Sequence, residues 1–317
     1  MVLLKMIFNR EKMRLILLLT TILLFDNQIC AGHNAGEEEE WSPVSLGPVT
    51  TWTSPLCGKG RLVVQPFIFY NRTRGLFNND NHTDALPAGD KKWQRQYQFF
   101  TQYGITDKFE IDGQTVYQEN YRRQGANSAR TTGLGDSCLF SRYCAIEEKG
   151  WIPHTTGVFQ LKLPTGKYQK LDPNKLGTDS MGATSGGGSY DPGMGLLLTK
   201  KFKPFVLHAD AIYNFPLERK VDGIKTQYGK YLNCDFGAEY FLPKGFNLML
   251  EFNGFLQGDK RQNGSRQPAT DIRSLIAAPG IGWSCQTFQT LVAYQRIIAG
   301  TNTDANDSVV FSVVYTF

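Results

Sequence analysis

The chain has 317 residues, of which 41% are hydrophobic, 13% aromatic and 20% charged, and its formal net charge is +5. This composition is typical of a folded protein and excludes a disordered chain. After residue 31, no apolar run reaches the roughly eighteen residues that a membrane-spanning helix needs, so any passage through a membrane must use strands. Basic residues are scattered along the chain, which argues against nucleic acid as a partner.

Residues 1–31 have the pattern of an export signal. Basic residues between Lys5 and Arg14 precede the apolar stretch 15–25, and small residues follow at 30–32. This order is typical of a secretory signal peptide. The sequence therefore predicts that residues 1–31 are removed during export.

Residues 32–60 show no regular periodicity. The acidic run 37–40 is followed by a stretch rich in proline, threonine and glycine. Two interpretations are open: a flexible periplasmic lead-in, or a segment folded back into the following domain as a partial plug. We expect the lead-in.

From Arg61 onward, apolar and polar residues alternate. In segment 109–122, Phe109 and Ile111 begin an oily face, whereas Glu110 and Asp112 begin a polar one. A period of two predicts half-buried β-strands. The sequence predicts twelve strands, near residues 61–70, 92–103, 109–122, 134–146, 154–163, 193–202, 205–215, 231–242, 246–255, 273–284, 287–297 and 308–317.

The connections between these strands alternate in length. Short ones such as 104–108 alternate with long polar ones such as 123–133, 164–192 and 298–307. Bacterial outer-membrane barrels have tight periplasmic turns and long outer loops. An even number of strands also closes the sheet, so that no edge is unpaired in lipid. The sequence therefore predicts an all-β fold, a transmembrane antiparallel up-and-down barrel over residues 61–317.

The last predicted strand, 308–317, places apolar residues at its odd positions and ends on Phe317. It resembles the terminal signal of bacterial outer-membrane proteins, which the barrel assembly machinery reads. We therefore expect this machinery and outer-membrane lipids as partners, and the cell outer membrane of a Gram-negative bacterium as the location. A soluble β-sandwich or lipocalin-like barrel also alternates. The amide-rich polar faces and the rhythm of the loops favour the membrane barrel.

The polar faces of the strands are predicted to line the lumen, and acids outnumber bases there. In a medium of lowered dielectric, some of these acids should form ion pairs. The candidate pore-lining residues are Glu110, Asp112, Gln114, Gln118, Arg122, Lys162, His208, Asp210, Asp235, Glu239, Asn247 and Glu251. They either line a pore for neutral or weakly cationic solutes or fill a closed barrel with hydrogen bonds, because twelve strands lie between a filled and an open barrel.

The sequence contains few candidate catalytic residues. His154 has no serine or aspartate at a convincing spacing on its own strand face, and His208 lies two residues from Asp210 on one face. We expect the latter two to form a hydrogen-bonded lumen pair rather than a metal or proton site. No catalytic residue, cofactor or metal is therefore predicted.

Three stretches resemble one particular family. They are TTGLGDSCLFSRY at 131–143, VFQLKLPTGKY at 158–168 and TSGGGSYDPGMGLLLTKKF at 184–202. Their order and spacing are similar to those of the outer-membrane, transporter-like family named for the MetA-pathway of phenol degradation. The resemblance implies a barrel and the passage of small organic molecules.

The resulting hypothesis is an outer-membrane conduit, similar to a porin or transporter, for small organic solutes. One alternative is a structural or surface-interaction protein that acts through long loops near 71–91 and 164–192. A lipid-modifying barrel enzyme is the remaining alternative.

Overall fold

The computed structural model describes residues 41, 43, 45–166, 187–221, 223–285 and 287–317. The predicted signal peptide, residues 1–31, lies outside these ranges. Residues 43–317 form one compact unit.

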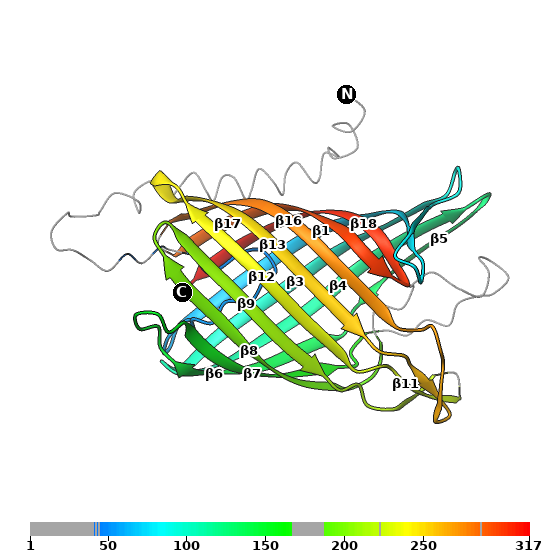
Figure 1. Ribbon diagram of the computed structural model, residues 1–317, viewed down its shortest axis with the longest axis horizontal. Coiled ribbons are helices and arrows are strands. Elements are labelled where there is room, and N and C mark those ends of the chain that lie inside the picture. Colours follow the sequence, from blue (N-terminus) through cyan, green and yellow to red (C-terminus); the bar gives the residue numbers. More distant parts are fainter. Residues whose placement is uncertain (1–40, 42, 44, 167–186, 222, 286) are drawn as a thin grey trace. The chain divides into compact units, whose positions relative to one another are not determined.

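The wall of this unit is a closed antiparallel barrel of twelve strands, as predicted (Figure 1). Each strand pairs with the next along the chain, and the last pairs with the first. The wall strands are β1 (Leu62–Phe77), β3 (Lys91–Thr106), β4 (Phe109–Gln124), β6 (Ser137–Ile146), β7 (His154–Leu163), β8 (Asp191–Phe202), β9 (Phe205–Asn214), β12 (Tyr231–Phe241), β13 (Phe246–Gln257), β16 (Ile272–Cys285), β17 (Phe288–Thr301) and β18 (Thr303–Thr316).

Smaller elements extend the wall at one end. β2 (Thr83–Ala85) pairs with the end of β1, and β5 (Asn127–Leu134) pairs with the second half of β4. A separate small sheet contains β10 (Arg219–Val221), β11 (Ile224–Gln227), β14 (Arg261–Gln262) and β15 (Ser265–Arg266). The turn η1 (Pro243–Gly245) joins β12 to β13. Among the described residues, no helix is long and apolar enough to cross a membrane.

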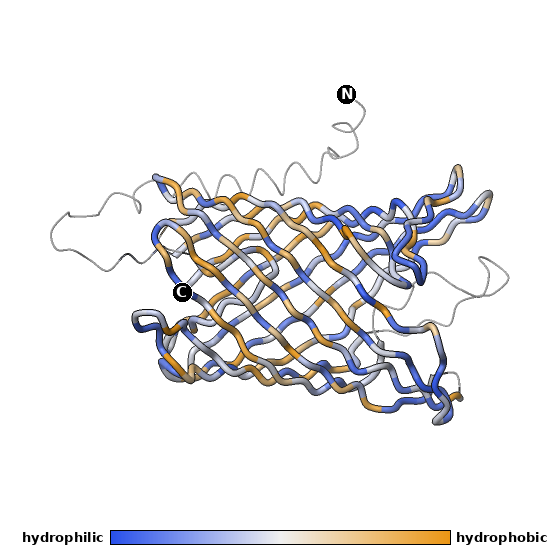
Figure 2. Tube along the Cα trace, in the orientation of Figure 1, coloured by the Kyte–Doolittle hydropathy of each residue, from blue (hydrophilic) through white to orange (hydrophobic). Residues whose placement is uncertain are grey.

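The alternation of apolar and polar residues in the sequence corresponds to the outward and inward faces of the wall strands. In β13, Leu248, Leu250 and Phe252 are exposed on the outer surface, whereas the intervening Asn247 and Glu251 are buried. Figure 2 shows the same alternation of hydrophobic and hydrophilic residues along the wall strands. An outward apolar face is the one that lipid requires.

The two ends of the barrel differ. The turns from β3 to β4 and from β8 to β9 are short, and Phe317 lies at this same end, where its N–H donates to the Leu62 carbonyl (2.8 Å). In outer-membrane barrels the end with short turns is periplasmic. We call it the inner end, and we call the opposite end, with β2, β5 and the small sheet, the outer end.

Two predicted loops at the outer end are instead hairpins. β17 and β18 are joined through Asn302, whose φ is 51°, and β4 and β5 through a turn that contains Gly125 at φ 56°. Both residue types tolerate this left-handed conformation. The predictions of long loops at 298–307 and 123–133 were wrong because strands that continue beyond the membrane no longer need an apolar face. Polar strand residues there have the composition of a loop.

Candidate functional site

The segment of residues 45–57, here called the plug segment, contacts the inward face of the wall. Its Trp52 ring packs against Phe140 of β6 and Phe100 of β3, with ring centroids 4.7 Å and 5.3 Å away. Val49 is buried in the same cluster. We expected a flexible lead-in from the sequence. These contacts instead favour the other interpretation, in which the segment folds back into the lumen. Trp52 therefore packs on the inward side of β3 and β6, the two strands that flank β4 in the wall.

Glu251 of β13 makes the densest set of contacts with the plug segment. Its carboxylate accepts hydrogen bonds from the backbone N–H groups of Val49 (3.0 Å), Thr50 (2.9 Å) and Thr51 (2.7 Å). The hydroxyls of both threonines donate to the same carboxylate, each at 2.9 Å. Hydrogen bonds to a charged acceptor are stronger than neutral ones, so Glu251 is a principal anchor of the plug segment.

Two further wall carboxylates accept backbone N–H groups of the plug segment. Asp210 of β9 accepts from Trp52 (3.0 Å), and Glu110 of β4 accepts from Cys57 (2.8 Å). The plug segment thus satisfies acids on three separate strands. Without it, these buried carboxylates would require other donors.

Arg142 of β6 supplies the positive charge at this level. Its side chain is only 1% exposed and pairs with Glu110 (2.5 Å) and Asp112 (3.7 Å). It also donates to the Thr53 carbonyl of the plug segment and lies over the Trp52 ring, 5.6 Å from its centroid. The sequence predicted that lumen acids would pair with bases, and this cluster is such a pairing.

His208 lies inside the barrel but not with the predicted partner. Its Nε2 lies 3.0 Å from Glu239 Oε1 on β12, and its Nδ1 lies 3.0 Å from the Thr199 hydroxyl on β8. Asp210 instead holds the plug segment. Residues two apart on one strand face are neighbours in sequence, but the cross-strand residues are closer, which the sequence alone does not show.

Glu239 connects this histidine to the plug segment. The Ser45 hydroxyl donates to its Oε2 (2.8 Å), and the Asn247 side-chain amide donates to the same oxygen. Three predicted lumen residues and the start of the plug segment therefore share one hydrogen-bond network.

His154 has partners that the sequence did not indicate. Its Nδ1 lies 3.0 Å from the Ser54 hydroxyl of the plug segment, and its Nε2 lies 3.5 Å from Cys144 Sγ. The sequence prediction concerned only the strand face of His154 itself, and Ser54 lies on another segment, 100 positions away. Ser54 is 0% exposed and its hydroxyl also lies 2.9 Å from the His154 carbonyl, so this serine is held in a structural bond.

Toward the outer end, amide side chains of the wall bind one another. Gln94 Nε2 lies 2.8 Å from Gln118 Oε1 and 2.9 Å from Asn120 Oδ1, and Asn71 Nδ2 lies 2.8 Å from Gln94 Oε1. These bonds join β1, β3 and β4 without the plug segment. In this part of the outer half, the amide side chains thus bind partners within the wall itself.

The remaining predicted pore-lining residues are half-buried. Lys162 pairs with Asp191 and lies 3.6 Å from Asp136. Gln114 and Asp235 lie on the inward faces of β4 and β12. All of these residues lie on the lumen side, and their part in conduction remains a proposal.

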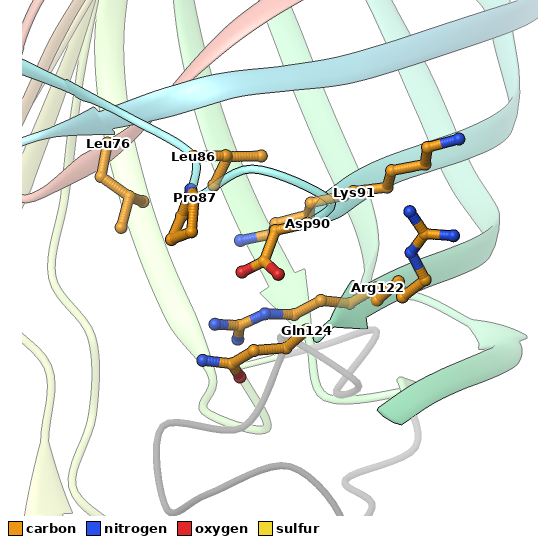
Figure 3. A pocket seen from close by; sticks show the side chains of 9 residues that line it. Leu76, Leu86, Pro87, Asp90, Lys91, Arg122 and Gln124 are labelled. Carbon is orange, nitrogen blue, oxygen red and sulfur yellow. The ribbon is translucent and has the colours of Figure 1, made fainter. Parts of the chain in front are cut away.

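A cavity of about 200 Å³ lies at the outer end, between the β1–β2 hairpin and the ends of β3 and β4 (Figure 3). It has an apolar part and a strongly basic part. Its lining is Leu76, Leu86, Pro87, Asp90, Lys91, Lys92, Arg122, Arg123 and Gln124. Arg122 is the one predicted lumen residue among them.

Comparison with solved structures supports the fold. The chain is similar to the COG4313 outer membrane channel from Pseudomonas putida F1, with a TM-score of 0.64 and 14% identity over 88% of this chain and 100% of that chain. A FadL homologue from Pseudomonas aeruginosa has a TM-score of 0.40 and 11% identity, covering 86% and 99% of the two chains. The translocator domain of the autotransporter NalP from Neisseria meningitidis has a TM-score of 0.45 and 12% identity, covering 82% and 89%.

A search of the curated proteins finds no match. The protein is an outer-membrane β-barrel, as its closed wall and its likeness to an outer-membrane channel show. A family model described as "Putative MetA-pathway of phenol degradation" matches residues 108–313. Because this match covers more than half of the sequence, the chain belongs to that family, which is the one that the three stretches resemble.

Proposed function

We propose that the barrel conducts small organic molecules across the outer membrane, and that the plug segment closes the inner half of its lumen. The observation that supports this most directly is the way the plug segment is held. It binds the wall largely through peptide groups and carboxylates, and water can replace each of these partners when the segment leaves. Such an exchange has a modest net cost, about 0.5–3 kcal/mol for each bond.

The charge of the lumen indicates the class of solute. The plug segment itself carries no charged residue. Its departure would therefore expose the carboxylates of Glu251 and Asp210 to the conducting path. A path lined by acids and amides favours neutral or weakly cationic solutes over anions. The family description names phenol degradation, and phenol is a small neutral molecule.

Planar-bilayer conductance tests this proposal. In the structure the Thr50 hydroxyl lies 3.2 Å from the Asn253 amide oxygen, so Thr50→Cys/Asn253→Cys offers a site for a short thiol cross-link between plug segment and wall. We expect discrete openings for the unmodified protein, few or none for the cross-linked variant, and recovery after reduction. Each single cysteine variant, treated in the same way, is the control.

The alternatives predict other results. A barrel that stays silent in all forms, and whose outer loops bind a surface partner, would support the surface-interaction hypothesis instead. If the openings are unaffected by the cross-link, the proposal of a conduit stands, but the proposal that the plug segment gates it is wrong.

We further propose that the barrel acts without a catalytic step. The histidine and serine that meet, His154 and Ser54, are locked in mutual hydrogen bonds, and the serine is buried. A hydrolase needs an accessible nucleophile. Phospholipid hydrolysis that disappears in the His154→Ala variant would contradict this part of the proposal.

The chain's last strand also supports an assembly partner. Phe317 is 68% exposed at the inner end, where it follows a strand that closes the wall. We propose that the barrel assembly machinery reads it. A Phe317→Ser variant should accumulate less folded barrel in membranes than a Tyr315→Phe control, and equal amounts would contradict this.

A further inference from the structure

The outward faces of β1, β3, β4 and β5 carry a group of basic residues near the outer end. Strand register fixes their positions. Arg72, Trp93, Tyr121 and Arg130 are opposite one another across the four strands and form one row. Aromatic rings therefore separate two arginines in this row.

The neighbouring rows continue the pattern. One step toward the membrane, Arg95 lies between Tyr70 and Glu119, and one step outward, Lys91 is opposite Arg123. These five residues and Arg72, Trp93, Tyr121 and Arg130 are here called the basic patch. It contains five basic residues, Arg72, Lys91, Arg95, Arg123 and Arg130, against one acid, Glu119.

Part of the patch is held in place by its own contacts. The Arg95 guanidinium lies over the Trp93 ring, 4.9 Å from its centroid, and the Trp93 and Tyr121 rings stack at 5.2 Å. Glu119 pairs with Arg95 (3.5 Å) and with Arg130. Asp307 of β18 is opposite Arg72 at the edge of the patch, where it pairs with Arg74 and Arg296. Within the patch itself, one carboxylate faces five cations, so the patch keeps a net positive charge that its own residues do not neutralise.

The row below the patch locates the membrane. Ile68, Tyr97, Tyr117 and Leu134 are opposite one another there, and all four are exposed on the outer surface. Aromatic residues gather at membrane interfaces, and basic side chains lie beyond them toward water. The patch thus begins where the outward surface changes from apolar to charged.

The opposite wall lacks this arrangement. The last outward residues of β9, β12 and β13 in the described structure are Tyr213, Leu232 and Leu256, which are uncharged. Within the wall, β9, β12 and β13 therefore carry no such row of basic residues.

We propose that the basic patch binds the phosphate groups of the phosphorylated glycolipid that forms the outer leaflet of a Gram-negative outer membrane. The guanidinium forks of Arg72, Arg95 and Arg130 match phosphate oxygens, and Lys91 adds a point charge. The aromatic rings among them lie at the depth where the sugar and acyl parts of such a lipid meet. This inference is independent of conduction.

The cavity at the outer end adjoins the patch. Lys91 and Arg123 belong to both, and Leu76, Leu86 and Pro87 provide the apolar side of the cavity (Figure 3). A hollow with an apolar side and a basic side at the border of the patch suits an amphipathic anion better than a free inorganic ion.

Native mass spectrometry of the full-length protein in detergent tests the proposal, with bisphosphorylated lipid A as the probe. The variant Arg72→Gln/Lys91→Gln/Arg123→Gln leaves the Glu119 ion pairs intact. Since each basic residue near a charged membrane surface contributes about 1 kcal/mol, we expect affinity to fall on the order of 100-fold. The variant Lys220→Gln/Lys225→Gln/Arg261→Gln, which removes the same charge from the small outer sheet, is the control and should bind normally.

Three results would overturn the proposal. They are equal loss in both triple variants, undiminished binding by the patch variant, and equal binding of lipid A from which both phosphates have been removed. Competition by millimolar inorganic phosphate as effective as that by lipid A would assign the patch to free phosphate instead. A heat-dependent gel shift of each variant confirms that the barrel has folded.

Discussion

The two halves of the lumen satisfy their polar groups in different ways. In the inner half, Glu251, Asp210 and Glu110 depend on backbone N–H groups of the plug segment. In the outer half, Gln94 and Gln118 bind amides of the wall itself. For the proposed conduit, this difference places the change between closed and open states in the inner half, where the described hydrogen bonds join the wall to the plug segment.

Of the changes that test this difference between the two halves, removal of the plug segment should have the largest effect. A variant without residues 45–57 loses the segment that, among the described residues, fills the inner half, so we expect conductance to rise several-fold in planar bilayers. Removal also exposes Glu251 and Asp210, so selectivity for cations should increase. Conductance that stays the same would mean that the outer half limits passage.

The buried cluster around Arg142 should dominate stability. Arg142→Gln leaves Glu110 and Asp112 without their cation, and breaking a buried pair in this way costs about 3–5 kcal/mol. Urea unfolding in detergent, followed by tryptophan fluorescence, measures the loss. Arg95→Gln, whose side chain is 32% exposed at the outer end, is the control and should cost about 1 kcal/mol or less. Similar losses in both would contradict the importance of burial.

Weakening one anchor should have an intermediate effect. Glu251→Gln retains the shape of the side chain but removes its charge, so the plug segment should dock less tightly by about 1–3 kcal/mol. We expect more frequent openings at unchanged single-channel amplitude. Gln94→Ala removes hydrogen bonds of the outer half alone and should leave the opening frequency unchanged. The reverse result would place the gate in the outer half.

The smallest expected effect is on an outer loop that lies beyond both halves of the lumen. The carboxylate of Asp259 accepts backbone N–H groups of Thr270 (2.9 Å) and Asp271 (3.0 Å) and pairs with Arg266 (2.5 Å). The Thr270 N–H bond and the Arg266 bond lower the pKa of Asp259 below its usual value near 3.8. A lowered pKa means that the contact is fully present above 3.8 and is lost as the pH falls through the lower value of the folded loop.

Hydrogen exchange of the loop measures this dependence. The amides of Thr270 and Asp271 should stay protected at pH 4 and become exposed only in stronger acid. Asp259→Asn should abolish the protection at every pH, whereas Asp80→Asn should not affect it. Loss of protection already above pH 4 would contradict the direction of the shift.

The wall strands could be predicted from the sequence because contact with lipid requires a regular apolar face on each strand. Segments such as 246–255 must keep one apolar face for their whole length within the membrane, and this requirement is visible as a period of two. Beyond the membrane the requirement ends, and the hairpins at 123–133 and 298–307 were therefore interpreted as loops.

The contacts of the lumen were less predictable for a different reason. The plug segment has no period because its partners are individual side chains and not a neighbouring strand. The pairs Ser54 with His154 and Ser45 with Glu239 join residues that are 100 and 194 positions apart. Nothing in the local sequence of Arg142 indicates which two acids it joins.

The plug segment's partners are distributed over most of the chain, from Glu110 on β4 to Gln289 on β17, which binds the Leu46 N–H. Its docked position therefore exists only when early and late strands have already come together. The plug segment can therefore occupy the lumen only after assembly of the barrel is complete. A barrel arrested before its late strands join would lack the binding site for this segment and would remain permeable.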